Sequence, residues 1–199
     1  AYVYGGGATI DDNGLSITVS NNLAAPPGSG VTNLPWSGSL TNYVGAPYVE
    51  ISGGGGAGAA AVALFDYTIG MVTGVVITSA GKDYTSGPTV TLRGGGNTNY
   101  VLGTAAIGAN TSGGLTKTGA GTLTLAGANT YEGPTLISAG TLAVNNGSGS
   151  ATGTNLVTIG AGATLAGTGT VAGVVSVSAG GRVTPGNSSV GFFTCGGLI

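Results

Sequence analysis

The sequence predicts an all-β chain, with an elongated β-solenoid or parallel β-helix in the C-terminal half and β-rich repeats in the N-terminal half. Apolar residues alternate with Thr and Ser in short runs such as 122–125 and 135–138, which is typical of strands with one buried face. Small residues that suit tight turns separate these runs, and no segment shows the 3.6-residue apolar spacing of a helix. The runs are too short for independent sheets, so we expect each to lie on a neighbour, as in a repeat protein.

The composition favours a folded chain and argues against several kinds of binding partner. Glycine supplies 43 of the 199 residues and only 5% are charged, yet Val, Leu, Ile and Thr recur in ordered alternation, which favours a folded chain over a disordered one. A net charge of −2 without a basic cluster argues against binding to nucleic acid or to anionic membranes. No apolar run approaches the ~18 residues of a membrane helix, so we expect no membrane insertion by this segment. A weakly charged surface also opposes self-association little.

Residues 1–35 form the first of three expected segments. An Asn-Gly pair between the apolar runs 8–10 and 15–19 predicts strand, tight turn and strand, and the Pro- and Gly-rich stretch 26–30 predicts a stiff loop. This segment matches neither repeat described below. An open solenoid coil presents unpaired backbone groups, so we expect residues 1–35 to act as a cap or docking segment.

Residues 36–113 form the second segment, with two β-rich repeats. Residues 43–55 match residues 84–96 at a spacing of 41 residues, each unit having a tyrosine turn, a proline, an alternating strand and a glycine run. The glycine runs lack a following GK[ST], so turns are expected there in place of phosphate loops. We expect Tyr43 and Tyr84 to pin the turns. The unit resembles the GxGYTSAPTVTIxGGGG-type repeat of bacterial surface proteins and phage tail proteins.

Residues 114–199 form the third segment. The stretch 115–142, LTKTGAGTLTLAGANTYEGPTLISAGTL, resembles the autotransporter passenger-associated β-strand repeat, and 178–188 resembles the AGGTLxPGNSxG phrase that follows such repeats. Arg182 and the run 192–195 depart from the usual pattern. The resemblance implies a parallel β-helix in a secreted or surface-exposed bacterial protein, and it supplies no molecular activity.

The alternation also predicts which side chains face the solenoid core. Aliphatic residues at inward positions should stack into columns, each contributing about 1.5–3 kcal/mol on burial before ordering entropy is subtracted. These are Leu123, Leu125, Leu136, Leu142, Val144, Val157, Ile159, Leu165, Val171, Val175 and Val177. The corner asparagines Asn129, Asn145, Asn146 and Asn187 are expected to adopt left-handed conformations or to form side-chain ladders.

Few residues offer chemistry. The chain has no His and a single Cys, so we expect no catalytic, cofactor-binding or metal-binding residues and no cofactor, and we expect the protein not to be an enzyme. The run 11–14 has calcium-loop residue types but lacks the spaced bidentate glutamate. Lys117 is expected to be solvated; the alternative, an isopeptide bond, would lower the mass by one ammonia or water. Cys195 is expected to be a small buried residue, with an intermolecular disulfide as the alternative.

The predicted function is that of an extracellular structural protein. We expect a subunit or segment of a bacterial surface fibre or filament that self-associates through its ends, with copies of itself as partners and the extracellular space or cell surface as its location. The alternative is an adhesin passenger fragment that binds glycans or matrix; a polysaccharide-active enzyme is a third, more distant hypothesis. The chain starts without a leader and ends on strand-like residues, which suggests a mature piece of something longer or an end that docks on another copy. The residues expected at an interface are Tyr2, Tyr4, Trp36, Phe192, Phe193 and Cys195.

Overall fold

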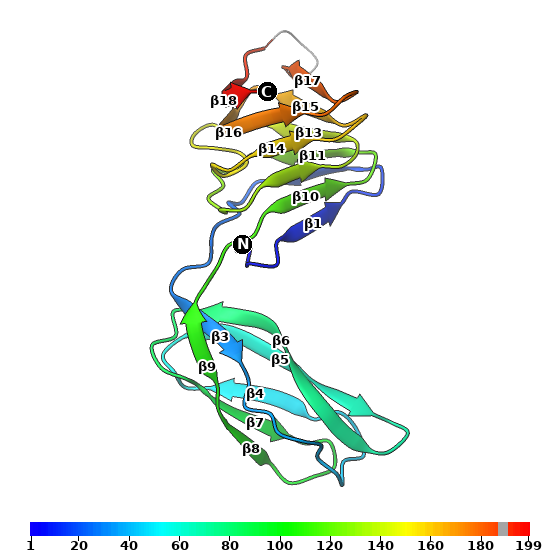
Figure 1. Ribbon diagram of the computed structural model, residues 1–199, viewed down its shortest axis with the longest axis vertical. Helices are drawn as coiled ribbons and strands as arrows, with labels where there is room; N and C mark the ends of the chain where they lie inside the picture. The colour runs from blue at the N-terminus through cyan, green and yellow to red at the C-terminus, as the bar shows by residue number, and fades with distance from the viewer. Residues whose placement is uncertain (187–190) are drawn as a thin grey trace. The chain divides into compact units, whose positions relative to one another are not determined.

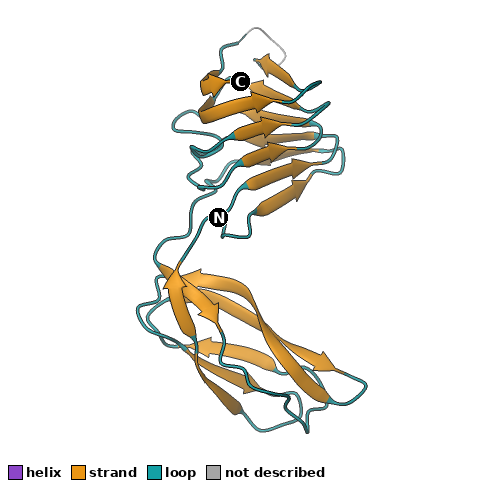
Figure 2. Cartoon of the chain, in the orientation of Figure 1, coloured by secondary structure: helices purple, strands orange, loops and turns teal. Residues whose placement is uncertain are grey.

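The chain folds into two all-β units. The computed structural model describes residues 1–186 and 191–199, and these residues form strands, turns and loops without a helix (Figure 2). One unit, the solenoid unit, comprises Ala1–Pro26 and Thr111–Ile199, and the other, the inserted unit, comprises Pro27–Asn110 (Figure 1). No helix in the described part of the chain is long and apolar enough to cross a membrane. The all-β class predicted from the sequence is confirmed.

The division into units differs from the three consecutive segments expected, 1–35, 36–113 and 114–199. Residues 1–26 belong to the solenoid, since β1 (Ala8–Asp11) and β2 (Ser16–Val19) pair in parallel with strands that follow the insertion. The expected separate cap is therefore a solenoid coil, formed by the part of the chain that precedes the inserted unit.

Two parallel sheets form the sides of the solenoid. In the first sheet the order is β1, β10 (Leu115–Thr118), β12 (Thr135–Ile137), β14 (Val157–Ile159), β16 (Thr170–Val177) and β18 (Thr194–Leu198). In the second it is β2, β11 (Thr122–Leu125), β13 (Thr141–Val144), β15 (Thr164–Gly167) and β17 (Arg182–Pro185). Each of the first five coils contributes one strand to each sheet, and β18 adds a sixth strand to the first sheet alone (Figure 1). The predicted solenoid in the C-terminal half is confirmed.

The solenoid core consists of aliphatic columns. Ten of the predicted inward side chains are buried or pack against the buried cluster. They are Leu123, Leu125, Leu142, Val144, Val157, Ile159, Leu165, Val171, Val175 and Val177. Parallel pairing aligns them, as in the rows that join Leu123 to Leu142 and Leu142 to Leu165.

The prediction for Leu136 is wrong, because this side chain is 40% exposed. The register pairs inward-facing Leu115 and Lys117 of β10 with Thr135 and Ile137 of β12, so Leu136 between them faces outward. The buried Thr135 hydroxyl hydrogen-bonds the Tyr131 hydroxyl at 2.6 Å, which satisfies both polar groups in the core.

Asparagine side chains connect successive coils. Asn129 Oδ1 accepts the Leu23 N–H at 2.7 Å and its Nδ2 donates to the Ala151 carbonyl at 2.6 Å. Asn146 Oδ1 accepts the Thr170 N–H at 2.9 Å. The corner asparagines therefore bridge backbone groups of different coils. Of the two expected alternatives, the left-handed conformation is not taken by Asn129, Asn145 or Asn146. Asn187 lies outside the described residues.

The inserted unit is antiparallel. Its larger sheet has the order β6 (Met71–Lys82), β5 (Ala57–Asp66), β4 (Tyr48–Ser52), β7 (Thr89–Arg93) and β8 (Tyr100–Thr104). A smaller sheet pairs β3 (Ser29–Asn33) with β9 (Ala106–Ala109). Its core is a second hydrophobic cluster that includes Val31, Val72, Val90 and Leu92.

The two sequence repeats of the inserted unit pack against each other reciprocally. Glu50 and Thr91, which are equivalent residues of the two repeats, face each other across the β4–β7 pair. The alternating strand of one repeat thus lies antiparallel to that of the other, which relates them by an approximate two-fold axis.

The tyrosine turn of each repeat packs on the glycine run of the other. A Cβ added to Gly54 would lie only 2.9 Å from the Tyr84 ring. A Cβ added to Gly95 would lie 2.8 Å from the Tyr43 ring. The N–H after each tyrosine donates to the carbonyl of the facing glycine, at 2.9 and 2.8 Å. Both glycines have positive φ and both tyrosines are buried. The predicted turn-pinning role of Tyr43 and Tyr84 is confirmed.

Candidate functional site

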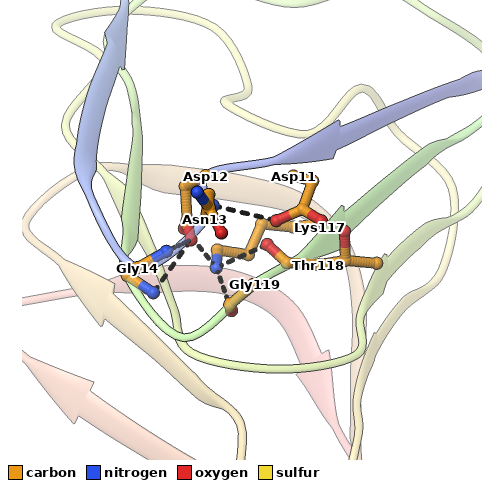
Figure 3. Close-up of polar contacts among 8 residues, drawn as sticks. Asp11, Asp12, Asn13, Gly14, Lys117, Thr118 and Gly119 are labelled. Carbon is orange, nitrogen blue, oxygen red and sulfur yellow. Dashed lines mark hydrogen bonds and ion pairs between the residues drawn. The ribbon is translucent and has the colours of Figure 1, made fainter.

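A buried ion pair joins the parts of the chain before and after the insertion. Asp12 directly follows β1, and Lys117 lies in β10, the strand paired with β1. Lys117 Nζ lies 2.5 Å from Asp12 Oδ2, and both side chains are fully buried (Figure 3). The two residues meet because the first coil lies directly on the second.

The turn at residues 11–14 fixes the carboxylate of Asp12. Asp12 Oδ1 accepts the N–H of Gly14 at 3.0 Å and the N–H of Gly121 at 2.9 Å. The neighbouring Asp11 accepts the N–H of Asn13 at 2.9 Å, and Asn13 takes a positive φ of 48°. One carboxylate oxygen of Asp12 is thus held by two backbone donors, while the other contacts lysine.

Lys117 is buried, so the expected solvated lysine is wrong. Its Nζ donates to the carbonyls of Thr118 at 3.0 Å and Gly119 at 2.8 Å in addition to contacting Asp12 (Figure 3). Two of the three N–H donors of the ammonium thus go to backbone carbonyls, and its charge is paired with the Asp12 carboxylate. Strand alternation in the sequence indicates that Lys117 is buried. Lys117 is two residues from the inward-facing Leu115, so both side chains lie on the same face of β10.

The ion pair sets the charge state of Asp12. The hydrogen bond from Lys117 lowers the pKa of the Asp12 carboxyl, burial opposes this by disfavouring the charge, and the N–H groups of Gly121 and Gly14 lower it further. The net direction is downward, so a lowered pKa keeps Asp12 in its carboxylate form at neutral pH.

Two glycines leave the space that the pair occupies. A Cβ on Gly140, whose φ is 64°, would lie 2.7 Å from Lys117 Nζ and 2.6 Å from the Gly119 carbonyl oxygen. A Cβ on Gly119 itself would collide with the carboxylates of Asp12 and Asp11. Side chains at either position would therefore displace the ion pair.

The run 11–14, which has residue types typical of a calcium loop, does not form a cluster of metal ligands in the described structure. Within residues 1–186 and 191–199, no three His, Cys, Asp or Glu side chains lie together as metal ligands. The Asp12 carboxylate is already engaged by lysine and by backbone N–H groups.

The residues expected at an interface belong to two different units of the chain. Tyr2 and Tyr4 belong to the first coil, with their rings edge to face at 6.5 Å. Trp36 packs against the core of the inserted unit. The last coil holds the remaining three residues. Phe192 is 91% exposed, whereas Phe193 and Cys195 pack against the solenoid core. The six residues thus divide between the two units, and within the solenoid unit between its first and last coils.

The outer face of the larger sheet in the inserted unit carries an exposed apolar row beside a second ion pair. Cross-strand pairing aligns Val76, Val62, Tyr48 and Arg93. Tyr48 is 68% exposed, and Val62 and Val76 are also exposed. Arg93 binds Glu50 at 2.6 Å, with its Nε and a terminal nitrogen both on Glu50 Oε2. This face combines an aromatic ring with a fixed donor and acceptor.

The outer face of the second solenoid sheet carries hydroxyl groups. Register aligns Ser16, Thr122, Thr141 and Thr164 along successive strands, ending at Arg182. Threonine suits an outward strand position because it combines β propensity with an uncharged polar group. This face is therefore polar without being charged along most of its length.

Comparison with known families identifies the repeat in the solenoid. Residues 115–144 match the model of the passenger-associated-transport-repeat family. The matched residues contain β10 to β13, which are two complete coils, and they include Lys117. Neither curated proteins nor solved structures give a match to the chain.

Two features bear on the kind of protein: the matched repeat at residues 115–144 and the parallel solenoid built around it. They fit a repeat protein of the autotransporter passenger type. The family suggests a secreted or surface location.

Proposed function

We propose that this chain is a non-catalytic structural segment of an extracellular bacterial passenger, in which a β-solenoid presents an inserted β-sheet unit. The match of residues 115–144, lying within uninterrupted parallel sheets, is the observation that carries this proposal. Coil stacking buries aliphatic columns and needs no cofactor or disulfide for a core.

The edges of the solenoid support self-association with copies of itself. β1 and β2 each pair on one side only, as do β18 and β17 in the described residues. Such edges offer backbone donors and acceptors to another strand. A parallel joint between β18 of one copy and β1 of the next would continue the first sheet, and repetition of this heterologous contact would build a filament.

Electron microscopy and light scattering of the purified chain test this proposal. Regular filaments, or concentration-dependent growth in mass, are expected. Substitution of Thr9 by Pro removes a backbone donor in edge strand β1 and should reduce assembly. The control Leu15→Ser changes an exposed side chain between β1 and β2 while keeping every backbone donor, and should leave assembly unchanged. A strictly monomeric chain at high concentration would contradict the filament proposal.

Glycan binding is a second candidate function, supported by the outer face of the inserted unit. The Tyr48 ring offers a surface for stacking of a sugar ring. The Glu50–Arg93 pair beside it holds a carboxylate acceptor and a guanidinium donor in fixed positions, which suits neighbouring sugar hydroxyls. Together they support the adhesin alternative.

A glycan array followed by calorimetry tests the second candidate. We expect Tyr48→Ala and Glu50→Gln each to weaken binding of a glycan that the wild-type chain retains. Tyr67→Ala is a matched control, since Tyr67 is also exposed but lies in a turn outside the row of Tyr48. Equal losses from all three variants, or no glycan bound by the wild type, would contradict glycan binding at this face.

A further inference from the structure

The ion pair of Asp12 and Lys117 has the geometry of a reaction site. Its amine and carboxyl lie in contact, with Nζ 2.5 Å from Oδ2, and both side chains are fully buried. The remaining oxygen, Oδ1, is held by the N–H groups of Gly14 and Gly121. This arrangement places a nucleophile, a leaving oxygen and two donors for a developing oxyanion around one carbon.

We propose that Lys117 and Asp12 condense to an intramolecular isopeptide bond. In the first step a proton passes from Nζ to Oδ2, which converts the ion pair into an amine and a carboxylic acid. Nζ then attacks Cγ of Asp12, and Oδ1 takes the negative charge between the N–H groups of Gly14 and Gly121. A second proton moves from nitrogen to Oδ2, the Cγ–Oδ2 bond breaks, and water leaves. The Cγ–Nζ amide keeps one N–H, and no oxidant or co-reactant is consumed.

The fold supplies what this reaction lacks in water. Two groups held in contact react with effective molarities of about 10⁵–10⁸ M when well oriented, which favours condensation over hydrolysis. Burial also excludes the bulk water that would compete with the amine for Cγ and hydrolyse the product. The carbonyls of Thr118 and Gly119 hold the other amine hydrogens and orient the nitrogen.

The bond would close the chain across the insertion. The inserted unit, Pro27–Asn110, lies entirely between the linked residues in the sequence. Tension applied between the residues before Asp12 and those after Lys117 would pass through the bond, and the inserted unit would bear none of it. The first coil would also stay attached to the second when its hydrogen bonds open.

Mass spectrometry of the full chain under denaturing conditions tests the proposal. The expected mass is lower than the calculated one by one water. Trypsin does not cut after an acylated lysine, so residues 94–182 should remain whole and linked to residues 1–82. A mass equal to the calculated one after prolonged incubation at neutral pH would overturn the proposal. Loss of water from a peptide that holds Asp12 without Lys117 would also overturn it, because that product is a cyclic imide.

Three variants test whether the loss of water comes from a bond between Asp12 and Lys117. Lys117→Met should restore the calculated mass, since the nucleophile is gone. Asp12→Asn should lose ammonia in place of water, a result that a purely structural ion pair does not give. Lys82→Met removes the other lysine, which is partly exposed, and should keep the loss of water. Loss of water that persists in Lys117→Met would contradict the assignment, and this readout does not require that variant to fold.

Discussion

The solenoid unit and the inserted unit place charge in opposite environments. In the solenoid, Asp12 and Lys117 form a fully buried pair whose remaining hydrogen bonds go to backbone groups of the corner. In the inserted unit, Glu50 and Arg93 pair on an outer sheet face that reaches solvent. Stacked coils leave corner carbonyls inside the fold, and a lysine can satisfy them. Hairpins of an antiparallel sheet leave few such groups, so charge stays on the surface.

The two units also use glycine for different reasons. In the solenoid, glycine lets one coil approach the next, since a Cβ on Gly121 or Gly173 would collide with the backbone of the coil before it. In the inserted unit, Gly54 and Gly95 make room for tyrosine rings. A similar composition therefore supports two folds, and the following predictions test the contrast from the largest expected effect to the smallest.

Core truncation in the solenoid should have the largest effect. Leu142→Ala removes a fully buried side chain and should lower the free energy of unfolding by about 2–5 kcal/mol. Leu136→Ala, on the preceding strand but exposed, should cost less than about 1 kcal/mol. Circular dichroism follows the strands, whereas the fluorescence of Trp36, the single tryptophan, follows the inserted unit alone. Equal shifts of both signals in Leu142→Ala would contradict the division into two units.

Removal of one partner should matter more for the buried ion pair than for the exposed one. Lys117→Met leaves a buried carboxylate without its cation and should lower the melting temperature of the solenoid clearly. Arg93→Met removes an exposed partner, and its effect on the Trp36 signal should be small. Thermal melts of both variants check this order, and a larger effect of Arg93→Met would reverse the comparison.

Substitution in a glycine run should separate backbone strain from loss of space. Gly53→Ala and Gly54→Ala share the strain of a positive φ, about 1–2 kcal/mol, but only the Cβ of Gly54 would meet Tyr84. We expect Gly54→Ala to be the more destabilising in denaturant unfolding followed by Trp36 fluorescence. Equal losses would indicate that Tyr84 does not depend on the glycine for its position.

The pH dependence at the alkaline limit should be a smaller effect and specific to the solenoid. Burial raises the pKa of Tyr131 to about 12, against a lowering by its hydrogen bond with Thr135. The folded pKa exceeds the unfolded value of about 10, so this contribution is complete below pH ~10 and is lost as the pH rises toward ~12. Tyr131→Phe should weaken this alkaline loss of solenoid stability. If the stability of Tyr131→Phe falls with rising pH as steeply as that of the wild type, other groups cause the alkaline loss of stability.

Alternation of apolar and polar residues predicted most of the solenoid core, but it did not predict for every strand which residues face inward. β12 has only three residues, so its own pattern cannot fix which face is buried; the neighbouring β10 does so through register. That is why Leu136 was misassigned. The same alternation, applied to Leu115 and Lys117, places the lysine on the buried face, although lysine side chains are seldom fully buried without a partner.

The partner of Lys117 and the domain boundaries could not be obtained from the sequence in the same way. Asp12 and Lys117 are separated by the whole inserted unit, and residues 1–26 lack the phrase that marks the later coils. The pairing of β1 with β10 and of β2 with β11 shows that they form one solenoid. The equivalence of Tyr43 and Tyr84, in contrast, is visible as a repeat in the sequence, although only the structure shows that each packs on the glycine run of the other repeat.

Hydrogen exchange at single-residue resolution tests most directly whether the chain before the insertion closes onto the chain after it. The Ala8 N–H donates to the Gly114 carbonyl at 2.9 Å, and the Leu23 N–H donates to Asn129 Oδ1 at 2.7 Å. Both amides should exchange as slowly as that of Leu115 within the second coil. Exchange of Ala8 and Leu23 at the rate of an unstructured chain, while Leu115 stays protected, would contradict the account.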